Sequence, residues 1–443
     1  MKRKIYSQLL EWKNSKVRKP LLLLGARQVG KTWIMKEFGR NEYSNMVYIN
    51  CDNEPLTKNL FTIDYDIKRL LLSFQAISGE TIVPGQTLII LDEIQESPRG
   101  IHSLKYFCEN APEYHIMAAG SLLGVTIAGQ ESFPVGKVDM LHLYPMDFAE
   151  FLEAMGEGRL KNLLEMRNPA LVEPFSEKLI DFLRQYCFVG GMPEIVKSFQ
   201  DSCDLNTVRR LQSDIVEAYR RDISKHTSKH ESIRIGQVLS SLPSQLAKEN
   251  KRFIFNVIKH GARSAEYEMA IQWLIDAGLV YKIPRVSKVA VPLNFYEDLS
   301  AFKLFFIDIG LLGCMSNIDP SAILLNPDLL SEFKGMMTEE YVCQQLISAG
   351  FNLFYWSNDR TPAELDFIVN SSAGPRPIEV KAATNVRSKS LSQFIKNNPD
   401  IKGIRFSLAG YIQQDWLTNY PLYSIPFYFK DSMILPIQQT EDL

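Results

Sequence analysis

Residues 25–32 of the chain read Gly25-Ala26-Arg27-Gln28-Val29-Gly30-Lys31-Thr32 and match the pattern Gly-x4-Gly-Lys-Thr at every defined position. An apolar run, Leu21–Leu24, precedes this stretch, and a helical pattern, Trp33–Phe38, follows it. Glycines at a bend between strand and helix let backbone N–H groups point at phosphate oxygens, beside the positive end of the helix dipole. We therefore predict a phosphate-binding loop whose eight residues surround a nucleotide.

Two side chains of this loop supply chemistry beyond the backbone. Lys31 is expected to bridge the β- and γ-phosphates, and the Thr32 hydroxyl is expected to hold Mg²⁺. A chance match in a glycine-containing turn is the alternative, and the flanking strand and helix argue against it. The expected cofactors are ATP and Mg²⁺.

A second apolar run, Leu88–Leu91, ends in two acids, Asp92 and Glu93. Asp92 is expected to anchor the Mg²⁺ shell, and Glu93 is expected to orient or deprotonate the attacking water. The alternative is that both acids merely cap a strand end. A glutamate at this position favours hydrolysis over transfer to a substrate hydroxyl. The sequence contains no Asn-Lys-x-Asp guanine signature, which favours ATP over GTP.

A third apolar run, Ile116–Ala119, leads into Gly120 and Ser121. We expect the end of this strand to lie beside the end of the strand that carries Asp92 and Glu93. This placement would bring the Ser121 hydroxyl near the γ-phosphate and make it a catalytic residue together with Lys31 and Glu93. A helix-capping serine is the alternative. ATPases of this type often complete their site with an arginine from a neighbour. The sequence does not choose among the candidates, which are Arg99, Arg159, Arg220 and Arg221.

The composition is that of a soluble protein with several domains. The 443 residues are too many for one ordinary core, and 49 Lys and Arg nearly balance 51 Asp and Glu. No global charge therefore draws the chain onto nucleic acid or an anionic membrane. Six cysteines form no Cys-x-x-Cys pair, and no apolar run approaches the roughly 20 residues that span a bilayer. We expect a cytoplasmic protein without a membrane partner. His226 and His230, four apart, are interpreted as surface residues on one helical face.

Short apolar strands alternate with helical segments over residues 1–154, which predicts an α/β domain with a parallel sheet. The expected strands are Leu21–Leu24, Val47–Asn50, Leu88–Leu91 and Ile116–Ala119. Residues 155–225 have a helical pattern. Three helical patterns and a strand follow in 226–295, an order that indicates a winged-helix module whose third helix enters a DNA groove. The alternative is an inter-domain packing module, because the third helix, Ala265–Ala277, holds three acidic residues and no Lys or Arg.

Beyond residue 326 a helix, Leu329–Ala349, leads into strands that carry two acids and a lysine. Asp366 begins one strand, and the return strand holds Glu379 and Lys381 on one face, because side chains alternate across a strand. A hairpin would bring Asp366 close to Glu379, where the three groups can bind Mg²⁺ and polarise a phosphodiester. This arrangement resembles the PD-(D/E)xK nucleases, with Glu339 on the helix as a further acid. The alternative is an exposed strand with ordinary surface charges.

The whole chain resembles a family of bacterial and archaeal AAA-type ATPases that end in a restriction-endonuclease-like domain of uncharacterised function. Besides Gly25–Thr32 and Gly120-Ser121, the likeness rests on Asp92–Gln95, Leu143–Phe148 with Glu150-Phe151, Gly190–Pro193, Phe306–Leu311, Gly335–Glu339, Glu364–Phe367 and Glu379–Lys381. It implies an AAA core, a helical and winged-helix middle region, a connector at 296–325 and a nuclease-like α/β domain at 326–443. One departure is Gly136-Lys137, where the family usually has Gly-Arg. A lysine lacks the planar fork with which an arginine would sense phosphate.

Two functions fit these observations. In the first, an ATP-driven enzyme acts on double-stranded DNA, and nucleotide turnover controls a Mg²⁺-dependent nuclease. In the second, ATP binding changes the conformation, and the C-terminal domain binds a partner or nucleic acid without cutting it. The four C-terminal residues favour the first function, whereas the modest net charge and the acidic third helix favour the second. We expect an ATPase with a DNA-related role and make no claim of cleavage. A second copy of the chain is a further candidate partner.

Overall fold

The chain forms two compact units in the computed structural model, each with its own sheet. Among the described residues, the first unit consists of Met1–Tyr144 with Asp276–Leu279, and the second consists of Pro145–Ile275 with the residues from Val280 to Tyr428. The structure describes residues 1–52, 55–128, 133–248, 251–318, 334–358, 361, 363–371, 374–382 and 388–428.

The first unit is built on a five-stranded parallel sheet with the strand order β2-β3-β4-β1-β5. Its strands are β1 (Leu21–Leu24), β2 (Asn45–Asn50), β3 (Thr87–Asp92), β4 (His115–Ala119) and β5 (Asp139–His142). The four strands predicted from apolar runs are confirmed. Strand β5 escaped prediction because its residues are partly or fully exposed, so it lacks the apolar run of a strand buried on both faces.

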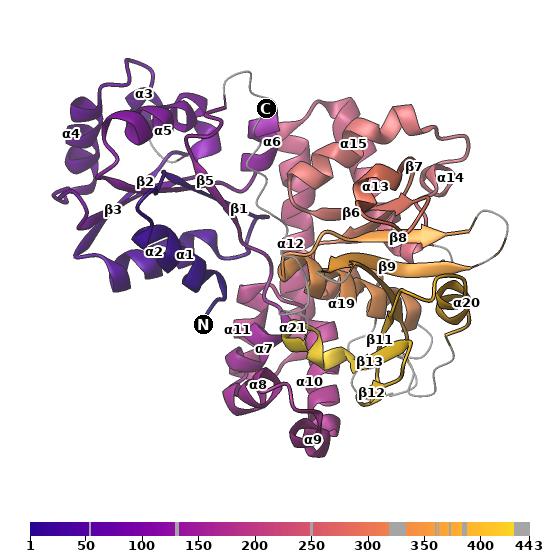
Figure 1. Cartoon of the computed structure of the whole chain (residues 1–443). Helices are drawn as coiled ribbons and strands as arrows, with labels where there is room; N and C mark the ends of the chain where they lie inside the picture. Colours follow the sequence, from indigo (N-terminus) through magenta and orange to yellow (C-terminus); the bar gives the residue numbers. More distant parts are fainter. Residues whose placement is uncertain are drawn as a thin grey trace. The chain divides into compact units, whose positions relative to one another are not determined.

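Helices cover both faces of this sheet, which explains why its central strands contain continuous apolar runs. The helices and one 3₁₀ turn are α1 (Ile5–Asn14), α2 (Lys31–Glu42), α3 (Pro55–Leu60), α4 (Ile67–Ser78), η1 (Ile94–Glu96), α5 (Pro98–Asn110) and α6 (Leu123–Ala128). Figure 1 shows α4 and α5 on one side of the sheet and α1 and α2 on the other.

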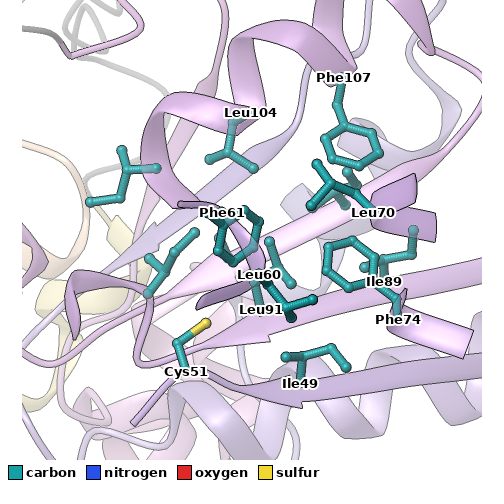
Figure 2. Packing of buried hydrophobic residues seen from close by; sticks show 14 of the residues in the cluster. Ile49, Cys51, Leu60, Phe61, Leu70, Phe74, Ile89, Leu91, Leu104 and Phe107 are labelled. Atoms are coloured by element: carbon teal, nitrogen blue, oxygen red, sulfur yellow. The ribbon is translucent and has the colours of Figure 1, made fainter. Parts of the chain in front are cut away.

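A cluster of apolar side chains joins α4 and α5 to the sheet (Figure 2). Ile89 and Leu91 stand two residues apart on β3 and therefore point to the same face. Phe74 of α4 and Phe107 of α5 stack in this cluster with 6.4 Å between their ring centroids. These side chains are almost fully buried, and burial of one such group contributes roughly 1.5–3 kcal/mol. The packing fixes β3 in place, and with it the acids at its end.

Helices make up the second unit as far as Asp276, as the sequence pattern predicts. They are α7 (Phe148–Ala154), α8 (Gly158–Glu165), α9 (Pro169–Val172), α10 (Ser176–Val189), α11 (Pro193–Ser202), α12 (Leu205–His226), α13 (Lys229–Leu246), α14 (Phe255–Ile258) and α15 (Ser264–Asp276). The shared helical face predicted for His226 and His230 is wrong, because the two residues lie on different helices. Helix α12 ends at His226, and the Ser228 side chain caps α13 by accepting a hydrogen bond from the Glu231 N–H.

Several motifs of the resembled family meet at the buried carboxylate of Asp308. Its oxygens accept hydrogen bonds from the N–H groups of Gly191, at 2.6 Å, and Leu311, at 3.0 Å. The carbonyl oxygen of Gly191 accepts a further hydrogen bond from the Met146 N–H at 2.7 Å. Burial raises the pKa of Asp308. The motifs around Met146, Gly191 and Asp308 therefore hold the second unit together.

The second unit also contains an eight-stranded mixed sheet with the order β12-β13-β11-β10-β9-β8-β6-β7. Its strands are β6 (Val280–Val286), β7 (Glu297–Phe306), β8 (Phe354–Ser357), β9 (Glu364–Ser371), β10 (Gly374–Val380), β11 (Gly403–Ser407), β12 (Ile412–Gln413) and β13 (Leu417–Pro421). The predicted hairpin is confirmed, since β9 and β10 pair antiparallel with Phe367 opposite Ile378. The helices described beside the sheet are α16 (Ile309–Met315), α19 (Lys334–Ser348), α20 (Lys389–Asn397) and α21 (Ile425–Tyr428).

Strand β6 connects regions that the sequence pattern separates. It pairs with β7 along one edge and with β8 along the other. The three strands lie in the stretches predicted as winged helix, connector and nuclease-like domain, respectively. One sheet therefore runs across the boundaries predicted at 295 and 325. Strand pairing depends on edges that are distant in the chain, and a local pattern does not reveal them.

Candidate active site

The predicted phosphate loop lies between the end of β1 and the start of α2. Its curvature comes from left-handed backbone at Gln28, with φ 67°, and at Gly30, with φ 96°. A glycine adopts such a conformation without the steric cost that a Cβ atom brings. Helix α2 begins at Lys31, so the N–H groups of its first turn are available to bind an anion.

The side chain of Lys31 folds back inside this loop. Its Nζ donates hydrogen bonds to the carbonyl oxygens of Gly25, at 2.7 Å, and Ala26, at 2.8 Å. Only 7% of Lys31 is exposed, and burial lowers its pKa to about 8, although Glu93 and Asp92 oppose the shift. The ammonium is thus held where it can exchange carbonyl contacts for phosphate oxygens.

The two predicted metal ligands, Thr32 and Asp92, lie together. The Thr32 Oγ1 donates a hydrogen bond to Asp92 Oδ2 at 2.7 Å, although the residues are 60 positions apart in the chain. Hydroxyl and carboxylate oxygens suit Mg²⁺, which proteins bind through one or two carboxylates together with substrate phosphates. The described residues include no group of three His, Cys, Asp or Glu arranged around a metal position. The pair therefore fits a Mg²⁺ ion that also relies on phosphate oxygens.

Sequence reasoning missed Tyr48, which contacts the same carboxylate. Its hydroxyl donates a hydrogen bond to Asp92 Oδ2 at 2.9 Å, and burial raises its pKa. The Lys36 Nζ lies 3.5 Å from the centroid of the Tyr48 ring. A signal was present in the alternation of β2, where Val47 and Ile49 are buried in the core and Tyr48 must face the other way.

Glu93 and Ser121 meet at the adjacent strand ends. Strands β3 and β4 pair with Asp92 opposite Ala119, so the expected neighbourhood of the two tips is confirmed. The Glu93 Oε2 accepts contacts from the Ser121 Oγ at 3.3 Å and from the Ser121 N–H at 3.4 Å. The same oxygen accepts a hydrogen bond from the Gln95 Nε2 at 2.6 Å. Gln95 was not predicted as a site residue.

Arg3 is a second residue that sequence reasoning missed. It is 7% exposed, and its guanidinium donates to the carbonyl oxygens of Val29, at 2.9 Å, and Tyr144, at 2.5 Å. These contacts tie the start of the chain to the phosphate loop. A basic N-terminal stretch gives no sign of which of its cations will be buried.

Arg99 is the candidate arginine that belongs to the first unit. Arg99 donates to the Thr62 carbonyl oxygen at 2.8 Å and to the Tyr65 hydroxyl at 3.2 Å, within its own unit. Arg159, Arg220 and Arg221 belong to the second unit. Lys137, which stands where the resembled family has arginine, forms an ion pair with Glu109 at 2.9 Å.

The four predicted C-terminal residues also lie together, within the second unit. Asp366 and Glu379 lie on the paired strands β9 and β10, and the Asp366 Oδ2 accepts a hydrogen bond from the Val380 N–H at 2.7 Å. Lys381 pairs with Glu379 at 2.9 Å. Glu339 of α19 is 7% exposed and joins the same cluster.

Two buried lysines that were not predicted neutralise Glu339. The Lys251 Nζ lies 2.5 Å from Glu339 Oε1, and the Lys303 Nζ lies 3.7 Å from Glu339 Oε2. Lys303 also forms an ion pair with Glu364. Burial alone would raise the pKa of Glu339, but the two lysines lower it. Lys303 gave a sequence signal that went unused, because it interrupts the apolar run of β7 at a fully buried position.

The pKa of Asp366 is raised, whereas the pKa of Glu339 is lowered. Burial raises the pKa of Asp366 to about 7, and the negative charge of Glu339 adds to this shift. We define the carboxylate cluster as the four acids and three lysines that meet here: Glu339, Glu364, Asp366, Glu379, Lys251, Lys303 and Lys381.

Comparison with known proteins identifies the first unit. Residues 17–152 match the family model described as AAA domain. Residues 180–322 and 334–430 match two families, each described as a domain of unknown function (DUF8612 and DUF4143). The chain therefore contains an AAA-type ATP-binding domain, which supports ATPase activity. The two other matches assign no activity to the rest of the chain.

Full-length comparisons add little to this assignment. No curated protein matches the chain. A similar solved structure is the Walker-type ATPase PABY2304 of Pyrococcus abyssi, with 14% sequence identity and a TM-score of 0.44. The similarity covers 71% of this chain and 95% of that one. Within the described part of the chain, no helix combines the length and hydropathy needed to cross a membrane.

Proposed function

We propose that the first unit hydrolyses ATP with Mg²⁺ and that Glu93 activates the attacking water. The observation that carries this proposal is the hydrogen bond between Thr32 of the loop and Asp92 of β3, with Glu93 as the next residue. It brings the predicted phosphate-binding and metal-binding groups to the same end of one parallel sheet. Ligands of open α/β sheets bind at the carboxyl ends of the strands.

Each residue has a defined part in this reaction. Loop N–H groups and Lys31 bind the phosphates, while Thr32 and Asp92 would hold Mg²⁺, which neutralises charge on the β- and γ-phosphates. Glu93 accepts a proton as the water oxygen attacks the γ-phosphorus. The bond from the γ-phosphorus to its bridging oxygen breaks, which gives ADP and inorganic phosphate.

Two variants test the assignment. Lys31→Ala should abolish ATP binding, measured by isothermal titration calorimetry, because the loop loses the ammonium group that is proposed to bind the phosphates. Glu93→Gln should bind ATP with Mg²⁺ and keep only a small residual rate of hydrolysis, measured as phosphate release. Lys16→Ala removes an exposed lysine of the same unit and serves as the control. Normal turnover in either test variant would remove that residue from its assigned role.

For the C-terminal domain, the ion pairs favour a non-catalytic role, the second of the two functions inferred from the sequence. Nuclease chemistry of the resembled type needs carboxylates that are free to bind Mg²⁺. Lys251 and Lys303 already pair with Glu339 and Glu364. Burial raises the pKa of Asp366 to about 7, so this carboxyl is only partly ionised near neutral pH and binds a metal ion less well than a full carboxylate. We therefore propose that this cluster holds the second unit together and that ATP acts as a switch for partner binding.

The middle region supports a protein partner over a DNA groove. Helices α13, α14 and α15 are followed by β6 and β7, an order that is compatible with a winged helix. Helix α15 exposes Glu266 and Glu268, and both carboxylates would repel DNA phosphates. Incubation of the protein with plasmid DNA and Mg²⁺, with and without ATP, distinguishes the two functions. Cutting that is lost in Asp366→Ala would establish the nuclease, whereas absence of binding and cutting supports the switch.

A further inference from the structure

We propose that Gln95 is a positioning residue for ATP hydrolysis and that it acts by fixing the orientation of the Glu93 carboxylate. This inference rests on the proposed function, because it takes Glu93 as the group that receives the proton. Gln95 lies in the 3₁₀ turn η1, two residues beyond Glu93 and directly after β3. None of the phosphate or metal roles involves it.

The contact between Gln95 and Glu93 is short and has one orientation. The Gln95 Nε2 lies 2.6 Å from the Glu93 Oε2. An amide presents a donor on one side and an acceptor on the other, and an acceptor facing a carboxylate would be repelled. The nitrogen must therefore face Glu93. Hydrogen bonds to a charged group of this length are among the stronger ones in proteins.

Ser121 acts on the same carboxylate oxygen from the neighbouring strand. Its Oγ and N–H lie 3.3 Å and 3.4 Å from Glu93 Oε2, at the end of β4, the strand that pairs with β3. Since both neighbours contact Oε2, the direction of the other oxygen is fixed as well. One oxygen of Glu93 is thus anchored, and the second is left to receive a proton in a defined direction.

The opposite side of the Gln95 amide fits against Gly120. A Cβ atom at position 120 would lie 1.8 Å from Gln95 Oε1 and 2.9 Å from its Cδ. The next neighbour of that Cβ, a carbon of Leu123, would be at an ordinary 3.5 Å. Of the three atoms nearest to that Cβ, only the two of the Gln95 side chain would have to move to admit it. Glycine at the tip of β4 and glutamine after β3 form one steric pair.

Two local features indicate that this arrangement serves the reaction. Gln95 Oε1 is buried and has no hydrogen-bond partner among the described residues, an arrangement that costs stability. Glu93 itself has left-handed backbone, with φ 52°, which is unfavourable for a residue with a side chain. Unpaired polar atoms and strained backbone persist mainly where the geometry is used. Here both features surround the carboxylate that hydrolysis requires.

The first test separates orientation from binding. Gln95→Ala should lower kcat by roughly 10- to 100-fold, because a misplaced general base loses most of its effect. The Kd for ATP with Mg²⁺ should stay within about twofold, because Gln95 touches none of the phosphate or metal groups. Gln86→Ala, the same change at an exposed position before β3, should leave both quantities unchanged. A normal kcat in Gln95→Ala would overturn the proposal.

The second test uses Glu93→Gln as a background. If Gln95 acts only through Glu93, then adding Gln95→Ala to Glu93→Gln should cause no further loss of kcat. An additional loss of the full 10- to 100-fold would show a separate role for Gln95 and would contradict the proposal. Glu93→Gln alone tests the proposed function. Full turnover in that variant defeats the function itself, whereas normal turnover only in Gln95→Ala defeats the inference alone.

The third test exploits the steric pair. Gly120→Ala should displace the Gln95 amide and lower kcat as Gln95→Ala does. In the Gln95→Ala background the obstruction is gone, so Gly120→Ala should then have no further effect on kcat. Thermal unfolding of each variant, followed by circular dichroism, confirms that the protein is folded at the assay temperature. Multiplicative losses in the double variant would show that the two residues act independently and would overturn the proposal.

Discussion

The Thr32 hydroxyl and the Asp92 carboxylate are joined by a 2.7 Å hydrogen bond, and the Tyr48 hydroxyl contacts the same carboxylate oxygen at 2.9 Å. Asp92 is 3% exposed, so its oxygens are oriented by protein donors and little by solvent. Thr32 can exchange its bond to Asp92 for a metal ion, because both are ligand types for Mg²⁺. Tyr48 has no such role and remains an outer contact that orients the carboxylate.

Tyr48→Phe should therefore weaken the response to Mg²⁺. Outer contacts of metal ligands typically contribute 10- to 100-fold in affinity, so we expect the Mg²⁺ concentration at half-maximal ATPase rate to rise about tenfold. The variant keeps the aromatic ring under Lys36 and loses only the hydroxyl. Tyr65→Phe makes the same change elsewhere in the first unit and should leave the Mg²⁺ response unchanged. An unaltered response in Tyr48→Phe would show that the Asp92 contact is dispensable.

Nucleotide affinity should fall as the pH rises through about 8. Burial lowers the pKa of Lys31 to about 8, so the nucleotide-free protein loses the ammonium charge above this value. A bound triphosphate stabilises that charge, and binding above pH 8 should therefore take up a proton. Calorimetry in buffers of different ionisation enthalpy measures this uptake.

The matched variant for this experiment is Lys31→Arg, because an arginine stays charged throughout the accessible pH range. Its ATP affinity, although weaker, should be flat between about pH 7 and pH 9.5, since its charge does not titrate there. A wild-type affinity that is equally flat would contradict the assigned titration of Lys31.

The sequence was sufficient for four strands of the nucleotide-binding sheet, because β1, β3 and β4 are almost fully buried and each contains an apolar run. The phosphate and metal residues stand at the ends of these strands and could be found with them. Gln95 could not be found, because its role depends on which side chains meet after the strands have paired. The alternation of β2 gives the direction of Tyr48 but not its contact with Asp92. The apolar run of β7 makes Lys303 conspicuous, but neither Lys303 nor Lys251 carries a sign of its carboxylate partner, which is distant in the chain.

Asp366 makes the stability of the second unit depend on pH in an unusual direction. Its folded-state pKa is raised to about 7, whereas an unfolded aspartate titrates near 3.9. Between these values the folded state keeps a proton that the unfolded state has released. The free energy of unfolding therefore falls as the pH rises through this window. Above about pH 7 this titration lowers it no further.

Asp366→Asn removes this titration and keeps an oxygen for the Val380 N–H. We expect the midpoint of thermal unfolding of the variant to rise relative to wild type as the pH is raised from about 5 to about 8. Asp400→Asn changes an exposed aspartate and should follow wild type at every pH. A constant difference between Asp366→Asn and wild type would show that Asp366 does not titrate in this range.

Lys303→Met tests whether the carboxylate cluster is a structural element. Lys303 is fully buried, and its loss leaves Glu364 and Glu339 facing a thioether in place of an ammonium. Removal of one partner of a buried ion pair costs roughly 3–5 kcal/mol in the free energy of unfolding, measured by denaturant titration. Lys402→Met, at an exposed position, should change the free energy of unfolding by less than about 0.5 kcal/mol.

Adding Glu364→Gln to Lys303→Met should recover part of the lost stability, because it removes an uncompensated charge. If added Mg²⁺ instead restored the stability of Lys303→Met, the acids would be free to bind a metal, and the nuclease function would regain its support.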